Sequence, residues 1–538
     1  MSQVSRKNPY LTKIEDNQLV ITAEGKDFLK KIITDVDGDV YAFTKDVSPL
    51  LVAAAMARLS RRGSDLRTIY LDEFAFDQDR AGNLIHNVVT GFGDDSVQQL
   101  MGIHLVVENA SNLLTKKLEW GRFGAYLEQS TRYIFFDQKI NGRYRYYIPG
   151  NLNNGLKTDY IETMDAIFEL YSSMVRKVTD YLRQKIKEPT VKEERIAWLN
   201  ATRAQACDAV RPVLPASTAS TVGIFASTQA VENLIFLLLS ETLIEYQQTG
   251  EAILREARKV AGVFLERTDV PERGLAQVYY RSQTKMEFKK FVESLFENRD
   301  FGKMDEIKDQ VTLIDYWPKN ELDLIPEMIF SVAPNLSLNQ IRSVVGSWPI
   351  SLKEQIFNTY IGNRLNRRHK PGRAIEKAHY EWEIVGDYGT FRDLHRHRVV
   401  DSMEWRNLNV DHGFDIPDLV GEAKFEIDFL RCFELSAGLF ERMTREGYRE
   451  ESQYATLLGH KMRYRFIANA RASFHIHELR TGPQGHPGYR KIVNRMHELL
   501  TEVHPRLGAA MKFVNKGEDP QLTRLAAELA TQHKLSKS

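Results

Sequence analysis

An internal repeat constrains the fold of this chain more than any other feature of its sequence. The same succession of segments occurs twice: a glycine-rich turn, a helix, a motif that mixes basic and acidic residues, a long helix, a polar turn and another helix. Such self-similarity indicates that each copy forms the same structural unit. The 538 residues are also too many for one ordinary core. We therefore predict two tandem domains, residues 1–285 and 286–538, with the boundary in a weakly patterned, proline-interrupted region.

Apolar residues at helical spacing predict several long helices. Ser48 as N-cap and Pro49 at the first helical position predict a helix that ends near Gly63. Further helices are expected over residues 97–120, 159–182, 231–246 and 417–443. The longest apolar run, residues 234–239, is too short to span a bilayer, and the N-terminus has no apolar signal segment. We expect a cytoplasmic protein that does not enter a membrane.

The composition excludes several classes of function. The net charge is only +1, so no global field attracts nucleic acid, and a nucleic-acid-binding module is the least favoured class. Cys207 and Cys432 are too few for a disulfide framework and stand in apolar surroundings typical of buried thiols. His475 and His477 are two residues apart and so lie on different faces of a helix. No other histidine spacing suits a metal, and we predict no metal site.

A basic cluster, Arg396-His397-Arg398, lies at the centre of the second copy, with Glu404 a short distance beyond it. Guanidinium groups bind phosphate oxygens in bidentate pairs, so this cluster is a candidate anion site. A solvated basic face is the alternative interpretation.

Each copy carries part of a larger set of motifs. The first copy contains Glu128-Gln129-Ser130-Thr131-Arg132-Tyr133 and, further on, Arg211 before Val213-Leu214-Pro215. The second contains the basic cluster, Asn469-Ala470-Arg471 and Leu479-Arg480. These motifs resemble those of the flavin-dependent thymidylate synthases, whose signature reads R-H-R-x-x-S-x-N-E-x-S-x-R-Y and is followed by N-A-R and L-R. The resemblance covers about residues 41–260 and 340–505.

Neither copy keeps the whole signature. In the first copy Trp120 and Gly121 replace the first arginine and the histidine of R-H-R, Arg122 matches its third residue, and Leu238 replaces the L-R arginine. In the second copy Asp401 replaces a serine, residues 406–409 replace S-x-R-Y, and Gln453 stands where the counterpart of Arg211 would be. We expect that no single pocket restores the full set.

The resemblance implies an α+β fold, with two tandem copies of long helices and a mostly antiparallel sheet. It implies a methyltransferase that uses FAD, reduced by NADPH, to transfer a one-carbon unit from methylenetetrahydrofolate to dUMP or a related pyrimidine nucleotide. The residues implied for substrate binding are Glu128, Ser130, Arg132, Tyr133, Arg211 and Arg480, with Arg480 also catalytic because it would polarise the pyrimidine. Those implied for cofactor binding are Ser96, Glu376, Arg396, His397, Arg398, Glu404, Asn469, Arg471 and His475.

The resemblance also bears on assembly. The family is described as a homotetramer with sites between subunits, so a fused pair of copies is expected to form a homodimer that imitates it. Two alternatives stay open: a flavoprotein of the same fold with another substrate, and a non-catalytic nucleotide-binding or structural homologue.

Overall fold

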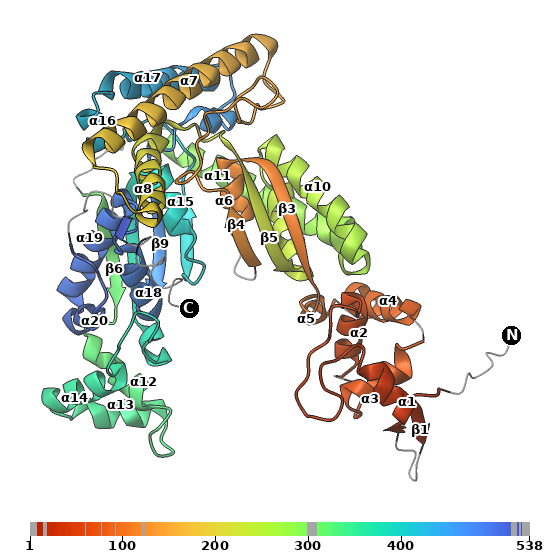
Figure 1. Ribbon diagram of the computed structural model, residues 1–538. Helices are drawn as coiled ribbons and strands as arrows, with labels where there is room; N and C mark the ends of the chain where they lie inside the picture. Colours follow the sequence, from red (N-terminus) through yellow and green to blue (C-terminus); the bar gives the residue numbers. More distant parts are fainter. Residues whose placement is uncertain are drawn as a thin grey trace. The chain divides into compact units, whose positions relative to one another are not determined.

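The computed structural model describes residues 8–13, 19–59, 61–76, 78–91, 93–120, 124–297 and 309–517, with Leu525, Ala526 and Leu529 (Figure 1). The chain divides into two compact units. The first comprises Met1–Val107, Phe123–Leu127 and Val222–Asp300, and the second Glu108–Arg122, Glu128–Thr221 and Phe301–Ser538. The units are not the two repeats, because much of the first repeat belongs to the second unit. The domain boundary between residues 285 and 286 stays a prediction.

The first unit is mainly helical. Its helices are α1 (Ala23–Leu29), α2 (Pro49–Leu59), α3 (Leu66–Glu73), α4 (Gln78–Ile85), the π-helix η2 (His86–Gly91), α5 (Asp95–Gln98), α9 (Thr228–Leu239), α10 (Ile244–Ala261), η4 (Gly262–Asp269) and α11 (Gly274–Phe296). The short strands β1 (Leu11–Lys13) and β2 (Leu19–Ile21) pair antiparallel. The strands β3 (Gly102–Ser111), β4 (Gly124–Glu128) and β5 (Ala219–Ser227) contribute residues to both units and form a sheet in the order β3-β5-β4.

The second unit contains the longer helices and a four-stranded sheet. Its helices of the first repeat are α6 (Asn112–Leu118), α7 (Asn154–Lys185), α8 (Lys192–Val210) and η3 (Arg211–Val213). Later helices are η5 (Glu321–Leu324), α12 (Ile325–Ile329), α13 (Leu338–Gly346), α14 (Ile350–Ile361), η6 (Arg373–Lys377), α15 (Tyr388–His395), α16 (Asp418–Glu422), α17 (Glu426–Arg445), η7 (Glu451–Ala455), α18 (Ala470–Arg480), α19 (Pro487–Val503) and α20 (Pro505–Ala510). Strands β6 (Val311–Trp317), β7 (His379–Asp387), β8 (Ser402–Trp405) and β9 (Lys461–Asn469) form an antiparallel sheet in the order β6-β7-β9-β8.

The sheets repeat one topology. In the order β3-β5-β4 the third strand along the chain lies between the first and the second, and β7-β9-β8 has the same arrangement. The predicted duplicated α+β fold is therefore confirmed, with β6 as an added edge strand in the second copy.

A capping residue ends a strand and begins a helix at four places. Ser111, Ser227, Asp387 and Asn469 are the last residues of β3, β5, β7 and β9, and the side chain of each accepts a hydrogen bond from the backbone N–H three residues on. A Ser, Asp or Asn side chain satisfies an otherwise unpaired N–H of the first helical turn, so the strand passes directly into a helix. This strand–cap–helix junction fixes the positions of α15 and α18, which carry most of the site described below.

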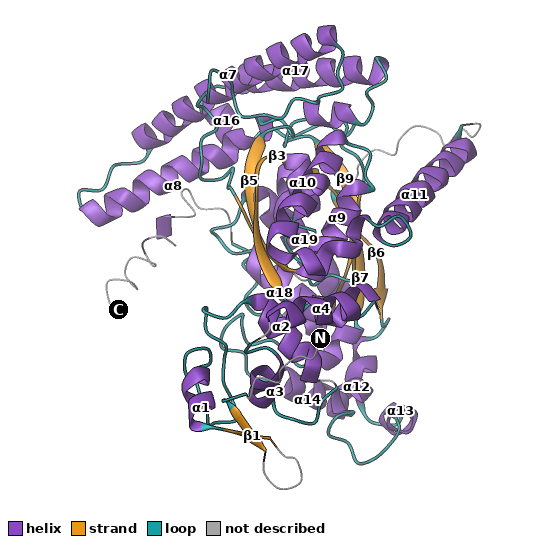
Figure 2. Ribbon diagram, turned by 90° about the vertical axis from the view of Figure 1, so that its right-hand side faces the viewer, coloured by secondary structure: helices purple, strands orange, loops and turns teal. Residues whose placement is uncertain are grey.

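Two equivalent segments pair with each other where the copies meet inside the second unit. The N–H of Ala216 donates to the carbonyl of Thr456 (2.7 Å), and the N–H groups of Leu458 and Gly459 donate to the carbonyls of Leu214 and Pro212 (both 2.8 Å). Figures 1 and 2 also show the long equivalent helices α7 and α17 side by side. Antiparallel pairing of equivalent segments produces a local pseudo-two-fold relation between the copies.

The predicted helix over residues 97–120 is wrong. Residues 102–111 form strand β3, and helix begins only after the cap at Ser111. Ile103, Leu105 and Val107 alternate with His104 and Val106, which suits a pleated strand, and β-branched residues favour that conformation. The helix predicted over 417–443 is two helices, α16 and α17, separated where Lys424 adopts a φ of 62°.

The helix predicted over residues 231–246 is divided between α9 and α10, but the expectations for two other helices and for the cysteines are confirmed. Helix α2 begins at Pro49, and α7 contains the predicted residues 159–182. Both cysteines are buried and free. None of the helices in the described part of the chain has the length and apolar character needed to cross a bilayer.

Candidate functional site

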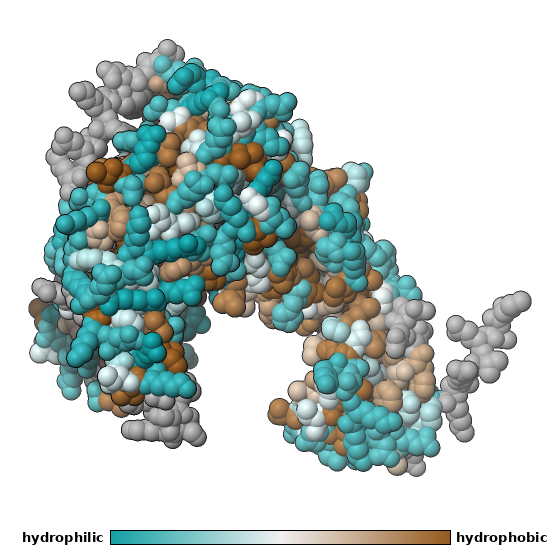
Figure 3. Space-filling view, turned by 45° about the horizontal axis from the view of Figure 1, so that its top comes forward, coloured by the Kyte–Doolittle hydropathy of each residue, from teal (hydrophilic) through white to brown (hydrophobic). Residues whose placement is uncertain are grey.

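A cavity of about 200 Å³ in the second unit collects arginines from both copies. We call it the arginine pocket. Its lining residues are Gln129, Ser130, Thr131, Arg132, Tyr133, Arg211, Gly389, Arg392, Asp393, Arg396 and Arg480. Exposed charged residues are common in this protein, since hydrophilic residues cover much of the face shown in Figure 3. Exposed charge alone would therefore not mark a functional site. What distinguishes this cavity is that several of its arginines are buried.

Secondary structure explains why these side chains converge. Arg392 and Arg396 lie four residues apart at the end of α15, so they share one helix face. Arg480 is the last residue of α18, and Arg211 follows α8 directly. Ser130 and Arg132 lie in the turn that follows β4.

Arg132 is held by a bidentate ion pair. Its Nε and Nη2 atoms donate to the two carboxylate oxygens of Asp208 at 2.7 and 2.6 Å. Burial opposes the charged form of Arg132, but Asp208 outweighs it and raises the pKa of the guanidinium. The same pair lowers the pKa of Asp208 despite its burial. Arg132 is thus a fixed cation rather than a mobile surface side chain.

Asp393 is the carboxylate that lines the cavity. Burial alone would raise the pKa of Asp393, but Arg211 first, and then Arg132, Arg480 and Arg396, lower it far below its usual range. Both Nη atoms of Arg211, which is 3% exposed, lie 3.3–3.4 Å from Asp393 Oδ2. A side chain at Gly389 would stand 3.4 Å from the Arg211 guanidinium and 3.1 Å from Asp387, so glycine gives Arg211 room to lie against α15.

Glu128 forms a buried network behind the pocket. Its Oε1 accepts from Arg392 (2.7 Å), and its Oε2 accepts from Lys116 (3.1 Å) and Arg396 (3.2 Å). Lys116 also pairs with Glu119. Burial would raise the pKa of Glu128, but Arg392, Lys116 and Arg396 lower it far below its usual range. Glu128 therefore joins cations of both copies.

The pocket has more positive than negative charge. It is lined by five arginines, and the carboxylates that pair with them are Asp208, Asp393 and Glu128. Lys116 and Glu119 cancel one another nearby. The Nε atom of Arg392 is buried without a hydrogen-bond partner among the described residues. The arginines outnumber these paired carboxylates by two, and the buried Asp387 also interacts with Arg211. The remaining excess of positive charge and the spare buried donor suit an anion such as a phosphate group.

Arg480 contacts His397 at the edge of the pocket. The Nε of Arg480 donates to His397 Nε2 at 2.7 Å, so that imidazole nitrogen acts as an acceptor. Burial, and then the positive charge of Arg480, lower the pKa of His397 well below its usual range. His397 is therefore a neutral residue that orients Arg480. The ring of His475 lies edge-on to the ring of His397, and the two ring centroids are 5.5 Å apart.

The residues implied for the cofactor form a second group beside His475. Arg471 donates to the carbonyl of Pro371 (3.0 Å) and pairs with Glu376 (3.3 Å). Partial desolvation, followed by the charges of Lys370, Arg480 and Arg367, lowers the pKa of His475, although the residue keeps substantial contact with solvent. This group therefore offers guanidinium, imidazole and ammonium side chains that are partly exposed to solvent. Such side chains fit the diphosphate of a flavin nucleotide. Asn469, however, caps α18 through Ala472 N–H (2.9 Å), which gives its side chain a structural role.

Of the remaining candidates, only Tyr133 lines the arginine pocket. Arg398 is half-buried, Glu404 is exposed on β8 and lies 3.7 Å from Arg465, and Tyr133 is an exposed residue at the pocket. Ser96 belongs to the first unit and donates to Asp94. Arg122 lies outside the described residues.

The expectation that no single pocket restores the full set stays a prediction, since Arg398, Asn469 and Arg471 do not line the arginine pocket, but most of the residues implied for the substrate do. The arginine pocket brings Arg396 and Arg480 of the second copy together with Ser130, Arg132 and Arg211 of the first. Arg392, Asp393 and Asp208 were not identified from the sequence. The four-residue spacing of Arg392 and Arg396 would have indicated the first of these.

Three arginines of the pocket have no cationic counterpart at the equivalent positions of the other repeat. Trp120, at the position of Arg396, meets Trp405 with ring centroids 5.8 Å apart, and His395 contacts both. Gln453, at the position of Arg211, accepts a hydrogen bond from the N–H of Leu408 (3.1 Å). Leu238, at the position of Arg480, is fully buried. The repeat-related position therefore lacks these cationic side chains, and each chain has one arginine pocket among its described residues.

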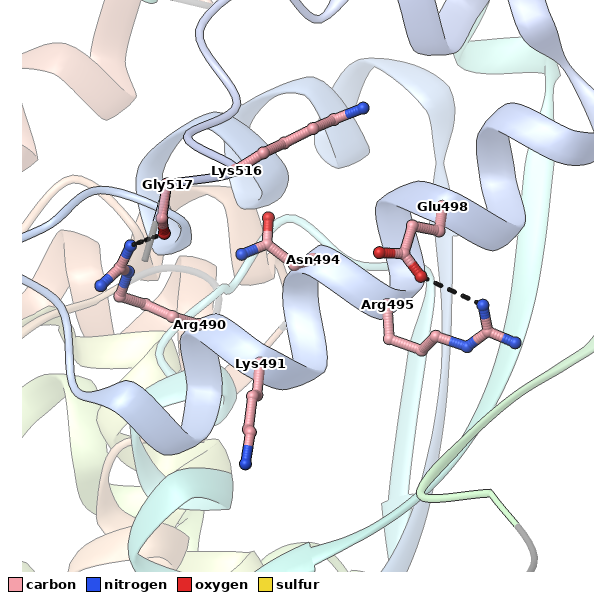
Figure 4. Close-up of a pocket in the computed structure, with 7 residues that line it drawn as sticks. All are labelled: Arg490, Lys491, Asn494, Arg495, Glu498, Lys516 and Gly517. Carbon is pink, nitrogen blue, oxygen red and sulfur yellow. Dashed lines mark hydrogen bonds and ion pairs between the residues drawn. The ribbon is translucent and has the colours of Figure 1, made fainter. Parts of the chain in front are cut away.

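A larger hollow of about 360 Å³ beside α19 is also basic, but it is built differently (Figure 4). Arg495 pairs with Glu498 (3.1 Å), Arg490 donates to the carbonyl of Gly517 (3.1 Å), and Lys491 is exposed. Arg490 is buried, whereas the exposed Lys491 and the Arg495–Glu498 pair are typical of a solvated charged face. Among the described residues, no group of three or more His, Cys, Asp or Glu could hold a metal ion.

The fold and the pocket together define a duplicated α+β protein in whose described part arginines of both copies converge on one cavity. The family model described as thymidylate synthase complementing protein matches residues 43–262 and 312–506, one segment in each copy. The chain belongs to this family, and the sequence resemblance is thereby confirmed.

Related proteins match most of the length of this chain. A UPF0159 protein of Chlamydia pneumoniae is 30% identical over 527 residues, which cover 94% of this chain and 97% of that protein. A UPF0159 protein of Thermoplasma acidophilum is 27% identical over 505 residues, covering 88% and 97%. The solved structure of a UMP/dUMP methylase PolB from Streptomyces cacaoi, bound with 5-Br dUMP, is 17% identical with a TM-score of 0.32 and covers 38% of this chain and 94% of that one.

Proposed function

We propose that this protein is a flavin-dependent thymidylate synthase-like methyltransferase whose arginine pocket binds the phosphate of dUMP or a related pyrimidine nucleotide. The carbon donor is methylenetetrahydrofolate, and NADPH reduces the FAD. Family membership supports this class of enzyme.

The observation that carries the proposal is the charge of the pocket. Five arginines outnumber the three paired carboxylates by two, so an excess of positive charge remains beside the buried Asp387. A phosphate monoester carries a charge of about −1.5 to −2 at pH 7. The nucleotide therefore neutralises the site, and the guanidinium groups supply the bidentate donors that phosphate oxygens prefer.

Some lining residues of the arginine pocket bind the nucleotide, and Arg480 takes part in the chemistry. Arg132, Arg211, Arg392 and Arg396 present cations to the phosphate, and the Ser130 hydroxyl is available to the phosphate or sugar. Arg480, oriented by neutral His397, stabilises negative charge on the pyrimidine ring during carbon transfer. Asp393 stays ionised and accepts hydrogen bonds, because four arginines lower its pKa.

Arg471, His475 and Arg398 would hold the flavin diphosphate, near Glu376 and Asn469. FAD supplies the hydride when it is bound and reduced. The Arg480–His397–His475 contacts connect this group of residues to the arginine pocket. We also propose that two chains form a homodimer that corresponds to the family's tetramer.

Nucleotide binding tests the pocket directly. We expect dUMP to bind with a stoichiometry of one per chain in isothermal titration calorimetry, because Trp120, Gln453 and Leu238 stand in the repeat where the pocket has Arg396, Arg211 and Arg480. Arg396→Gln should raise the Kd about tenfold or more, since it removes a charge-assisted contact from a side chain that is 46% exposed. Two binding events per chain, or an unchanged Kd in the variant, would contradict this assignment.

Flavin chemistry is tested by the visible absorption spectrum under anaerobic conditions. Protein loaded with FAD should bleach when NADPH is added, and dUMP should accelerate the bleaching. Arg398→Ala should abolish flavin retention while dUMP binding persists. If the protein cannot be loaded with FAD yet binds dUMP, the non-catalytic nucleotide-binding alternative holds instead.

A further inference from the structure

Helix α11 differs from the other long helices of the first unit in how little of it is buried. The structure describes every residue of α11, and only Gly274 among them is buried. The helix packs mainly on α9 and η4. In Figure 2 it extends away from α9 and α10, the other long helices of its unit. Most of the surface of α11 is therefore in contact with solvent in a single chain.

Polar side chains make the contact between α11 and α9. Lys285 pairs with Glu241, which lies just beyond α9, at 2.6 Å. The Arg281 guanidinium lies 6.0 Å from the centre of the Phe236 ring of α9. Charged side chains thus face the protein, where a surface helix ordinarily places apolar ones.

The large apolar side chains of α11 are exposed instead. Those that are 60–68% exposed are aromatic: Tyr279, Tyr280, Phe288 and Phe291. Single exposed apolar residues are common on protein surfaces, but a concentration of large ones marks an interaction surface.

Four apolar residues near the C-terminal end of α11 lie on one side of the helix. Phe288, Phe291, Val292 and Leu295 follow the spacing i, i+3, i+4, i+7, and we call them the α11 stripe. Val292 is half-buried, and the other three are exposed. A stripe with this spacing is typical of a helix that packs against another helix.

The described part of the chain contains no second copy of this helix. The family-matched segment of the first copy ends at residue 262, so α11 is an addition to the family fold. In the second copy the short helix α20 follows α19, and no counterpart of α11 comes after it within the described residues. An equivalent stripe is therefore supplied by another chain.

The exposed area is sufficient for a weak but specific contact. A fully buried aromatic side chain covers 150–250 Å², so one that is 60–68% exposed offers roughly 100–150 Å². The α11 stripe, with Tyr280 at its border, therefore offers roughly 500 Å² per chain. Two such surfaces bury roughly 1,000 Å² together, which is the lower limit of specific interfaces.

The charges beside the stripe distinguish between two occupants. Glu287 is exposed and lies one helical turn before Phe291, at the border of the stripe. Anionic lipids repel a carboxylate at this position, which disfavours a bilayer surface. A second protein surface of the same kind accommodates Glu287 at the solvated rim of the contact.

We propose that the α11 stripe binds the α11 stripe of a second copy of this chain. The same surface is used by both partners, so the contact is isologous and closes at two chains. It lies outside the family-matched segments and is therefore separate from the dimer proposed above as the counterpart of the family's tetramer. It depends neither on nucleotide binding nor on the proposed reaction.

Sedimentation velocity of the full chain at roughly 1–100 µM tests this contact, because an interface of this size corresponds to a Kd in roughly the micromolar range. The double variant Phe288→Glu, Phe291→Glu should lose one association step. A dimer becomes a monomer, or a tetramer becomes a dimer where the family-type contact also forms. Lys290→Glu introduces a carboxylate on the opposite side of α11 and should associate like the parent protein.

Chemical cross-linking identifies the surfaces in contact. Both native cysteines are buried, so a cysteine introduced on α11 is the reactive thiol. A short bismaleimide should link two chains of Phe291→Cys, which lies in the stripe. It should not link two chains of Glu293→Cys, which lies on the opposite side of the helix. Circular dichroism of all variants should match that of the parent protein, because the substituted side chains are exposed.

Three results would overturn the proposal. The first is a parent protein that shows no association, and the second is a double variant that associates like the parent. The third is a parent protein that stays monomeric but sediments with vesicles containing phosphatidylserine, while the double variant does not; the stripe would then be a lipid-binding surface. These measurements contain no nucleotide or flavin, so their outcome is independent of whether dUMP binds in the arginine pocket.

Discussion

Replacing Glu128 by glutamine should lower the free energy of unfolding by about 3–5 kcal/mol. The carboxylate is buried and compensates Arg392, Lys116 and Arg396, so its loss leaves cations in a low-dielectric environment with one neutral acceptor between them. Glutamine has nearly the same shape as glutamate, so a loss of stability in this variant reports the loss of charge and not a change in packing. Urea denaturation followed by tryptophan fluorescence measures the change.

The repeat provides a matched control for this experiment. Glu404 occupies the equivalent position in the second copy, but it is exposed and lies 3.7 Å from Arg465. An exposed pair of this kind contributes about 0–1 kcal/mol. Glu404→Gln should therefore leave the denaturation midpoint almost unchanged. Equal effects of the two substitutions would show that Glu128 does not stabilise the junction between the copies.

Replacing Arg480 by glutamine should lower the rate of carbon transfer about 10²–10³-fold while changing the Kd for dUMP much less. The reason is that Arg480 lies at the edge of the pocket beside neutral His397, where its charge opposes the negative charge that develops on the pyrimidine. Single-turnover measurements with reduced, FAD-loaded protein separate the chemical step from binding.

Two variants make the Arg480 result interpretable. Arg480→Lys retains the positive charge and should recover part of the rate. Arg495→Gln removes an arginine of α19 that pairs with Glu498 outside the pocket, and it should have no effect. A rate in Arg480→Gln equal to that of the parent protein would remove Arg480 from the chemistry.

The repeat and the helix starts could be predicted because local signals specify them. Pro49 and the amphipathic spacing of residues 159–182 are independent of tertiary context. The sequence does not distinguish helix from strand over residues 102–111, because their apolar positions satisfy a helical spacing as well as an alternating one. Pairing with β5 decides between the two conformations, and that pairing is made with residues more than 100 positions away.

The site was only partly predictable for a related reason. The motifs identified Arg132, Arg211, Arg396 and Arg480, but not which copy contributes to which pocket. Asp208 and Asp393 have no motif, and their importance comes from arginines that are distant in the sequence. The replacement of an arginine by Trp120 is visible in the sequence, whereas its contact with Trp405 requires the fold.

The hydrogen bonds between residues 212–216 and 456–459 have a consequence for how the two copies can change over time. They join main-chain groups, which every residue other than proline carries in the same form. Substitutions in these segments can therefore alter side chains without loosening the junction, and the equivalent positions just before them already differ, as Arg211 and Gln453. After such a duplication and fusion, one copy can keep its binding residues while the other loses them and retains only a structural role. The main-chain junction between the copies is kept in both cases.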